Sequence, residues 1–180
     1  MKNFEKIKTK QIDIFFGTGG VGKTTVSAAR AVQLAHAGKK VLLVTIDPAK
    51  RLKDIFKLSD DSAGTVTKIE SLPEAPKWSG ELSALLMSAP VTIKRMASNA
   101  GGVRELSENR IVKILAKPFG GMNEILALVE LEYQLSTGLY DCIVLDTPPG
   151  PHFLDFLHGI EKMKRFFESS YIEIFTSLNK

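Results

Sequence analysis

The sequence is poor in cysteine, and this scarcity excludes several kinds of site. Its 180 residues include one cysteine, Cys142, so a single chain forms neither an internal disulfide nor a multi-cysteine metal site. Cys142 opens the apolar run that continues to Leu145, which predicts a buried thiol on a strand. At this length we expect one domain.

Long apolar runs and dense basic tracts are also missing. No hydrophobic stretch approaches the ~18 residues of a membrane helix, and the basic N-terminus leads quickly into a glycine loop, unlike a signal peptide. We therefore expect a cytoplasmic protein without a membrane span. The net charge of +4 fits an anionic ligand, but Lys and Arg are spread along the chain, so nucleic acid binding is not favoured.

A glycine loop stands between an apolar run and a helical pattern, within Ile12 to Thr25. It fills the pattern G-x-x-x-x-G-K-[ST], the phosphate-binding P-loop. Glycines let backbone N–H groups turn inward, and the following helix N-terminus adds further donors for phosphate oxygens. Lys23 supplies charge for the β- and γ-phosphates, and Thr24 offers a hydroxyl to Mg²⁺. The predicted phosphate-binding residues are Gly17, Thr18, Gly19, Gly20, Val21, Gly22, Lys23, Thr24 and Thr25.

The first half of the chain reads as strand, helix and strand. Ile12 to Phe16 predicts a buried strand, Lys23 to Ala37 a helix, and Lys40 to Ile46 a second buried strand. A short helix is expected to start within Asp47 to Leu52, and Thr65 to Ile69 to form a minor strand. This order predicts a βαβ unit with a right-handed crossover.

The second half reads as mainly helical until a third clear strand at Tyr140 to Leu145. From Gly80 to Ser136 the apolar spacing is helical, and the helices expected there are 82–86, 91–97, 103–115 and 122–135. Helices are also expected over 153–175. The prediction is an α/β P-loop fold in a single domain, 1–180. Its mostly parallel sheet has helices on both faces, and a helical insertion, 80–136, lies between the second and third main strands.

Two acidic residues follow predicted strands, where open α/β sheets bind their ligands. Asp146 ends the run Val-Leu-Asp, the Walker B arrangement, and is predicted to hold Mg²⁺ with Thr24. Asp47 is then available to orient the attacking water, with a helix cap or turn as the alternative role. His152 follows a proline loop and is a candidate for facing the γ-phosphate, with a packing role as the alternative.

The stretch GTGGVGKTTVSAARAVQLAHAGKKVLLVTIDPAKRL resembles the opening of the arsenical-pump and tail-anchored-protein-targeting (ArsA/GET) ATPases, also called anion-transporting ATPase-like, of the deviant Walker P-loop class. The resemblance covers most of Ile12 to Leu157. It implies ATP and Mg²⁺ as ligands, a first switch at Asp47, and a second switch that runs from Asp146 through Pro148 to His152. It further implies a nucleotide-dependent homodimer and a client or partner protein, which the sequence does not identify.

Three departures from that family narrow the expectations. The family's signature lysine, second in the loop, reaches the partner's phosphates across a dimer, and Thr18 stands at that position here. The zinc-binding cysteine pair of the targeting enzymes is absent, and Cys142 alone cannot assemble an arsenite site. The family usually runs well beyond 180 residues, so we expect either a fragment or a minimal domain with an open base site, and base specificity stays undetermined.

The function expected from this sequence is Mg²⁺-dependent hydrolysis of ATP to ADP and phosphate, coupled to a conformational switch. Asp47 and Lys23 are the predicted catalytic residues. A kinase-type phosphoryl transfer, a non-hydrolysing nucleotide-dependent interaction module, and a partition-type (ParA/MinD-like) ATPase remain alternatives.

Overall fold

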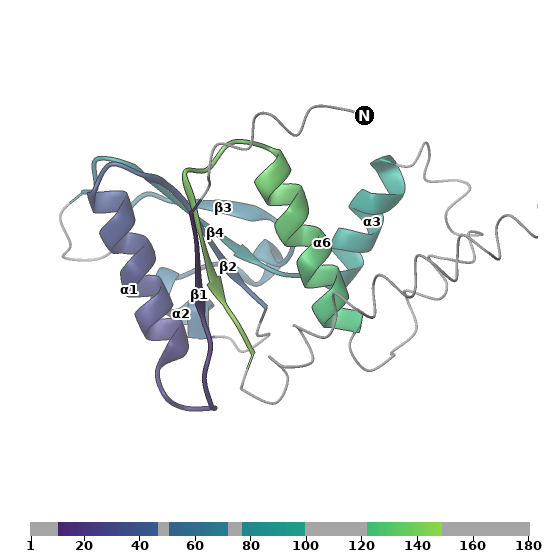
Figure 1. Ribbon diagram of the computed structural model, residues 1–180, viewed down its shortest axis with the longest axis horizontal. Helices are drawn as coiled ribbons and strands as arrows, with labels where there is room; N and C mark the ends of the chain where they lie inside the picture. The colour runs from purple at the N-terminus through teal and green to yellow at the C-terminus, as the bar shows by residue number, and fades with distance from the viewer. Residues whose placement is uncertain (1–10, 47–50, 72–76, 100–121, 149–180) are drawn as a thin grey trace, which may run out of the picture.

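The described part of the chain forms a five-stranded sheet with helices on both faces (Figure 1). The computed structural model describes residues 11–46, 51–71, 77–99 and 122–148. The strand order is β1-β5-β2-β4-β3; the first four are parallel, and β3 runs antiparallel to β4. The strands are β1 (Gln11–Phe15), β2 (Lys40–Thr45), β3 (Val66–Ile69), β4 (Glu81–Leu86) and β5 (Cys142–Asp146). The helices are α1 (Lys23–His36), α2 (Arg51–Phe56), the short 3-10 helix η1 (Asp60–Ser62), α3 (Ala89–Asn99) and α6 (Met122–Ser136).

The two central strands, β2 and β5, are buried on both faces because their sequences are almost entirely apolar. All five residues of β5 are buried, as are Val41–Thr45 of β2. Such continuous apolar runs are typical of parallel strands covered by helices. One core packs α1 and α2 against this sheet, and the other packs α6 against the opposite face. Cys142 lies buried at the start of β5 as a free thiol, as predicted.

Helix α1 joins β1 to β2 and confirms the predicted βαβ unit. Its small residues Ala28, Ala31 and Ala35 are buried, which allows the helix to lie close to the sheet. The helix ends at His36, and Gly38 follows the C-cap residue Ala37 with a φ of 81°, a left-handed conformation that favours glycine. Strand β5 lies between β1 and β2, so the helix crosses over one intervening strand.

The prediction of a helical pattern from Gly80 was wrong for residues 81–86, which form β4, a parallel strand beside β2. Its Leu82, Leu85 and Leu86 are compatible with one helical face, but the run is only six residues long. Apolar runs of this length do not distinguish a buried strand from a helix by periodicity. The helical part therefore starts at α3, after a fourth main strand.

Strand β1 is at the edge of the described sheet, so the prediction of a buried strand was wrong in this respect. Ile12 and Ile14 are 37% and 44% exposed, whereas their register partners Ile143 and Leu145 are buried. Helix α6 covers β5 and β2 on that face but leaves the β1 side chains partly open. Sequence alone does not reveal this, because an apolar strand has the same composition at an edge and at the centre.

The remaining element predictions that fall on described residues are confirmed within one or two positions at most ends. They include the antiparallel strand β3, α3 with Pro90 in its first turn, and α6. The predicted helices over 103–115 and 153–175 lie outside the described residues.

None of the helices in the described ranges is both long enough and apolar enough to cross a lipid bilayer.

Candidate nucleotide-binding site

The predicted phosphate loop starts close to the predicted metal carboxylate, at the carboxyl ends of the parallel strands. Asp146, the last residue of β5, is paired in register with Phe15 of β1 and with Thr45 of β2. Thr147 links the end of β5 to β1, since its backbone N–H and its hydroxyl both donate to the Phe15 carbonyl, at 3.2 and 2.8 Å. The loop that follows β1 therefore starts beside the carboxylate.

Two glycines of the loop are required by backbone conformation. Gly20 and Gly22 have φ values of 80° and 86°, in the left-handed region that other residues rarely adopt. A Cβ at either position would meet no protein atom within 4 Å, so packing is not the reason for glycine. Both residues thus shape the loop while leaving the space beside it open.

The N-terminus of α1 opens directly from this loop and carries no cap. Gly22 is its N-cap residue, which has no side chain to accept a hydrogen bond, and the first turn contains no acidic residue. The first N–H groups of a helix have no partner within it, and the helix dipole places positive charge there. This helix end is therefore suited to a phosphate group.

The side chain of Lys23 folds back over the loop. Its Nζ donates to the Thr18 carbonyl at 2.9 Å, so the ammonium group lies above the loop instead of extending into solvent. Thr18 thus contributes its carbonyl to the lysine, and its side chain is exposed. Next along α1, Thr24 is half-buried, and its carbonyl accepts a bond from the Ser27 hydroxyl at 3.0 Å.

Asp146 is fully buried, and a residue that sequence reasoning missed holds it. The hydroxyl of Thr45 donates to Oδ2 of Asp146 at 3.2 Å, and the N–H of Ile46 donates to the Asp146 carbonyl at 3.0 Å. The signal available in the sequence was one polar residue within the apolar run of β2. The Thr45 bond orients the carboxylate, and the Ile46 bond fixes the backbone of Asp146 at the end of its strand.

The donor set at this edge fits Mg²⁺. A carboxylate from Asp146 and a hydroxyl from Thr24 are hard oxygen donors, which Mg²⁺ prefers. In the part of the chain that the structure describes, no cluster of three or more His, Cys, Asp or Glu side chains could hold a metal. Mg²⁺ commonly uses one or two carboxylates together with water and substrate phosphates, so such a cluster is not required.

Two predicted site residues, Asp47 and His152, lie outside the described residues, so the structure does not place them relative to the loop. Pro148 is described and is buried directly after Thr147. The structure therefore places Asp146, at the end of β5, beside the strand that leads into the predicted loop of Gly17 to Thr25, with Pro148 two residues further along the chain.

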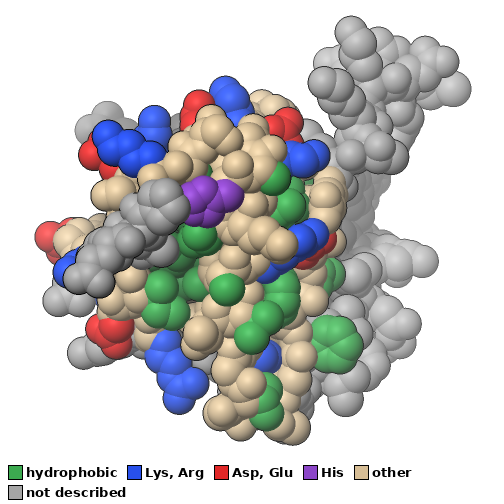
Figure 2. All heavy atoms as spheres, turned by 90° about the vertical axis from the view of Figure 1, so that its left-hand side faces the viewer, with side chains coloured by type: hydrophobic (Ala, Val, Ile, Leu, Met, Phe, Trp, Pro, Cys, Tyr) green, Lys and Arg blue, Asp and Glu red, His purple; other side chains and the backbone are tan. Residues whose placement is uncertain are grey.

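Large hydrophobic side chains are exposed at and beside the loop. Phe16, Val21 and Val26 are 67%, 60% and 54% exposed. Figure 2 shows hydrophobic side chains across the middle and lower part of the face that carries α1. The surface around the loop is thus apolar in part, although phosphate binding requires only polar and positively charged groups.

The Asp13–Arg30 ion pair and the Cys142 thiol lie close to β1 but outside the phosphate loop. Asp13 forms an ion pair with Arg30 of α1 at 2.8 Å. Partial burial acts to raise the pKa of Asp13, but hydrogen bonds from Arg30 and Gln11 and the Arg30 charge lower it below its usual value. Burial, followed by the nearby Asp13 charge, raises the pKa of Cys142 to about 11.

Comparison with known proteins agrees with this geometry. The anion-transporting ATPase (ArsA) family matches residues 10–179 of the chain. The chain is 33% identical over 168 residues to a putative arsenical pump-driving ATPase 2 of Aquifex aeolicus, covering 88% of this chain and 52% of that protein. It is 32% identical over 143 residues to an ATPase get3 of Schizosaccharomyces pombe, covering 79% of this chain and 41% of that protein.

A putative arsenical pump-driving ATPase of Prosthecochloris vibrioformis is 36% identical over 137 residues, which cover 75% of this chain and 32% of that protein. The chain thus spans about half the length, or less, of these relatives. The matched residues contain the loop, its helix and Asp146, as the predicted resemblance requires. The chain belongs to the anion-transporting ATPase family.

Proposed function

We propose that this chain binds ATP with Mg²⁺ at the loop between β1 and α1, and hydrolyses it to ADP and phosphate. The observation that carries the proposal is that three features lie together at the carboxyl ends of the parallel strands. An uncapped helix N-terminus, a lysine folded over a glycine loop, and a buried carboxylate all lie at the carboxyl ends of β1, β5 and β2. Family membership supports the same ligand.

Each described residue has a role that follows from its position. Backbone N–H groups of Gly17 to Thr25 would bind phosphate oxygens, helped by the α1 dipole. The Lys23 ammonium already lies over the loop and would exchange its bond to the Thr18 carbonyl for one to the β- and γ-phosphates. This positive charge would stabilise the charge that develops during phosphoryl transfer.

Mg²⁺ would be held by the Thr24 hydroxyl and the Asp146 carboxylate, and when bound it would neutralise phosphate charge. Thr45 keeps the Asp146 side chain oriented for this task through its hydroxyl. We assign to Asp47 the orientation of the attacking water, and to the segment from Asp146 to His152 the sensing of the γ-phosphate.

We further propose that ATP brings two copies together over the loop face, and that the coupled conformational change acts on a client protein. The exposed Phe16, Val21 and Val26 support an interface there, because exposed apolar patches mark association sites. Two of the relatives are named for arsenical pumps. We do not extend that role to this chain, because its one cysteine is buried and its thiol pKa is raised.

The first prediction tests nucleotide binding. Lys23→Ala should weaken binding of a fluorescent ATP analogue ~10- to 100-fold, which corresponds to losing one charged hydrogen bond of ~1.5–3 kcal/mol. Lys39→Ala is the matched control, because it removes the same charge from an exposed residue beyond the other end of α1. Equal affinities of wild type and Lys23→Ala, measured by titration, would refute the phosphate-binding assignment.

Hydrolysis is measured separately in a single-turnover assay with excess enzyme. Phosphate release that requires Mg²⁺ supports an ATPase. Tight ATP binding without phosphate release would instead identify a non-hydrolysing nucleotide-dependent module, an alternative consistent with Thr18 at the position of the signature lysine.

A further inference from the structure

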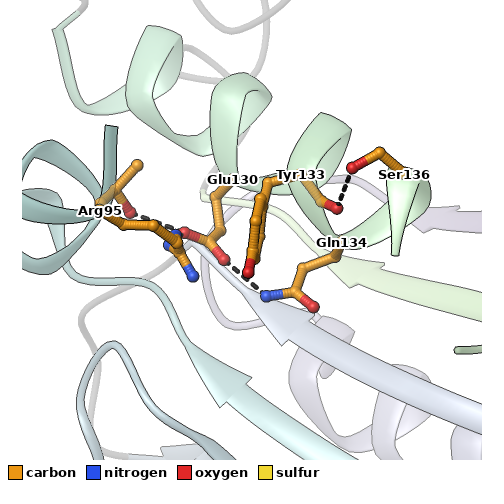
Figure 3. Close-up of polar contacts among 6 residues, drawn as sticks. Arg95, Glu130, Tyr133, Gln134 and Ser136 are labelled. Carbon is orange, nitrogen blue, oxygen red and sulfur yellow. Dashed lines mark hydrogen bonds and ion pairs between the residues drawn. The ribbon is translucent and has the colours of Figure 1, made fainter. Parts of the chain in front are cut away.

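A buried polar cluster joins α3 to α6 on the face of the sheet opposite α1 (Figure 3). At its centre is Glu130 of α6, whose side chain is 2% exposed. Its Oε2 accepts hydrogen bonds from the Thr92 hydroxyl at 2.8 Å and from the Arg95 guanidinium, both on α3. Its Oε1 accepts one from the Gln134 amide at 2.8 Å. We call Thr92, Arg95, Glu130 and Gln134 the polar seam.

The arginine of the seam is held from a second side. Its guanidinium carbon lies 4.4 Å from the centre of the Tyr133 ring, so the cation rests on an aromatic face while it pairs with Glu130 (Figure 3). Both charged groups are thus fixed by more than one contact. Hydrogen bonds and ion pairs are directional, so this arrangement sets how far along α6 the helix α3 can lie.

Among the described side chains of α3, apolar packing plays a smaller part than polar contacts in attaching the helix. Among its described side chains, residues 89–95, the buried one is Thr92, and none of them belongs to the apolar core beneath α6. Helix α6, in contrast, packs Ala127, Leu131 and Leu135 toward the sheet. A buried ion pair is a poor source of stability compared with apolar contacts, so the presence of one at this contact favours a role in positioning.

The two helices are attached to strands of the nucleotide site. Helix α3 starts just after β4, where the Met87 N–H donates to the Thr45 carbonyl at 3.0 Å. Helix α6 leads into β5, which ends at Asp146. Thr45, on the intervening strand β2, also donates its hydroxyl to Asp146, so β4 and β5, the strands next to the two helices, are connected through Thr45 at the site. The polar seam makes a second connection between these two parts of the chain, because it joins α3, which follows β4, to α6, which precedes β5.

We propose that Glu130 is a positioning residue that, through Arg95, holds α3 in register on α6 and thereby maintains the alignment of Thr45 and Asp146 for turnover. The effect on kcat can be measured only if the chain has the proposed ATPase function, so this part of the inference rests on that proposal. Lys23 and the loop between β1 and α1 would contact the phosphates directly, and α1 lies on the other face of the sheet, so we expect the seam to affect the KM for ATP less than kcat.

The test uses one conservative variant, one apolar variant and one control in the full chain. Glu130→Gln keeps the shape and removes the charge. A fourfold variant, Thr92→Val, Arg95→Met, Glu130→Leu and Gln134→Met, replaces the seam by apolar side chains of similar size, a change that often preserves stability. Glu132→Gln removes the same charge from an exposed residue of the same helix.

We expect both seam variants to lower kcat about fivefold or more while the KM for ATP changes less than about twofold, the scale of a modest coupling between sites. Amide hydrogen exchange within α3 should accelerate in both, with α1 and β2 unchanged, and Glu132→Gln should match wild type. If the apolar variant does not fold, Glu130→Gln carries the test.

A folded seam variant with wild-type kcat and wild-type exchange in α3 would overturn the proposal. So would faster exchange throughout the sheet, because that indicates general loss of stability. If the wild type shows no hydrolysis, the proposed function fails. The exchange measurement then decides the positioning role on its own, since selective acceleration in α3 supports it and its absence refutes it.

Discussion

At the scale of single residues, the loop residues were predictable because the motif dictates both residue type and spacing. The structure places Lys23 over the loop and Asp146 beside it. Thr45 and Thr147 were not predictable, because a threonine within or after a strand carries no signal until the register shows what it faces. Glu130 was hidden for a similar reason, since one acidic residue in an amphipathic helix is normally assumed to face solvent.

A prediction at this scale concerns Cys142. Burial raises its pKa to about 11, so at pH 8 its thiolate fraction is about a hundredfold lower than that of a thiol with an ordinary pKa of 9.0. The thiolate is the reactive form, and the residue is buried. We expect no measurable reaction with a thiol reagent in the native protein at pH 8 and complete reaction in guanidinium chloride. Rapid stoichiometric labelling of the native protein would contradict this.

At the scale of elements, the sequence distinguished helix from strand where the apolar pattern was long, and the prediction was wrong for one short apolar run. Helices α1 and α6 span several turns, and their apolar spacing identifies them. The six residues of β4 are too few for periodicity to decide, and the neighbouring helical patterns suggested the wrong type. The edge position of β1 depends on strand order, which involves the whole chain.

Two glycines at opposite ends of α1 provide a paired prediction. Gly22 and Gly38 have φ values of 86° and 81°, and a Cβ would clash with nothing at either site. Replacing each by alanine should therefore cost a similar ~1–2 kcal/mol of stability, from backbone strain alone. Only Gly22→Ala should also weaken ATP-analogue binding, because only Gly22 shapes the loop. Chemical denaturation and ligand titration measure the two effects, and equal loss of affinity in both variants would contradict the assignment.

A second prediction at this scale compares neighbouring isoleucine and leucine side chains on one face of the sheet. Ile14 and Leu145 are register partners, but Ile14 is 44% exposed and Leu145 is fully buried. Leu145→Ala should destabilise the fold by ~2–5 kcal/mol. Ile14→Ala should cost clearly less, because much of its side chain is already in water. Equal losses in urea unfolding would mean that Ile14 is covered in solution.

At the scale of the whole molecule, the fold class was predictable and the strand order was not. Strand, P-loop, helix and strand identify the α/β class, because each local pattern agrees with one architecture. The order in which strands pair depends on contacts between distant segments, about which local patterns carry no information. The predicted single domain, its limits and the helical segment over 103–115 stay predictions.

Association of two copies is the prediction that belongs to this scale. Thr18 stands where the related ATPases carry a lysine that reaches the partner, and it brings no charge across an interface. Thr18→Lys should tighten nucleotide-dependent dimerisation about tenfold, the difference between a neutral and a charged hydrogen bond. Sedimentation with a non-hydrolysable ATP analogue measures the monomer–dimer constant. An unchanged constant would mean that this position does not face a second copy.

The pairing of β1 has a consequence for how the protein is made. Strand β1 and the phosphate loop are synthesised before the other described strands, yet the strand to which β1 is bonded, β5, is the last of the described strands in the chain. Contacts between such distant segments form slowly, because a long loop must close first. Until β5 has been synthesised, β1 cannot form the backbone hydrogen bonds that join these two strands. Of the described strands, β1 is therefore made first, but its pairing with β5 beside the nucleotide site can form only after all the others have been made.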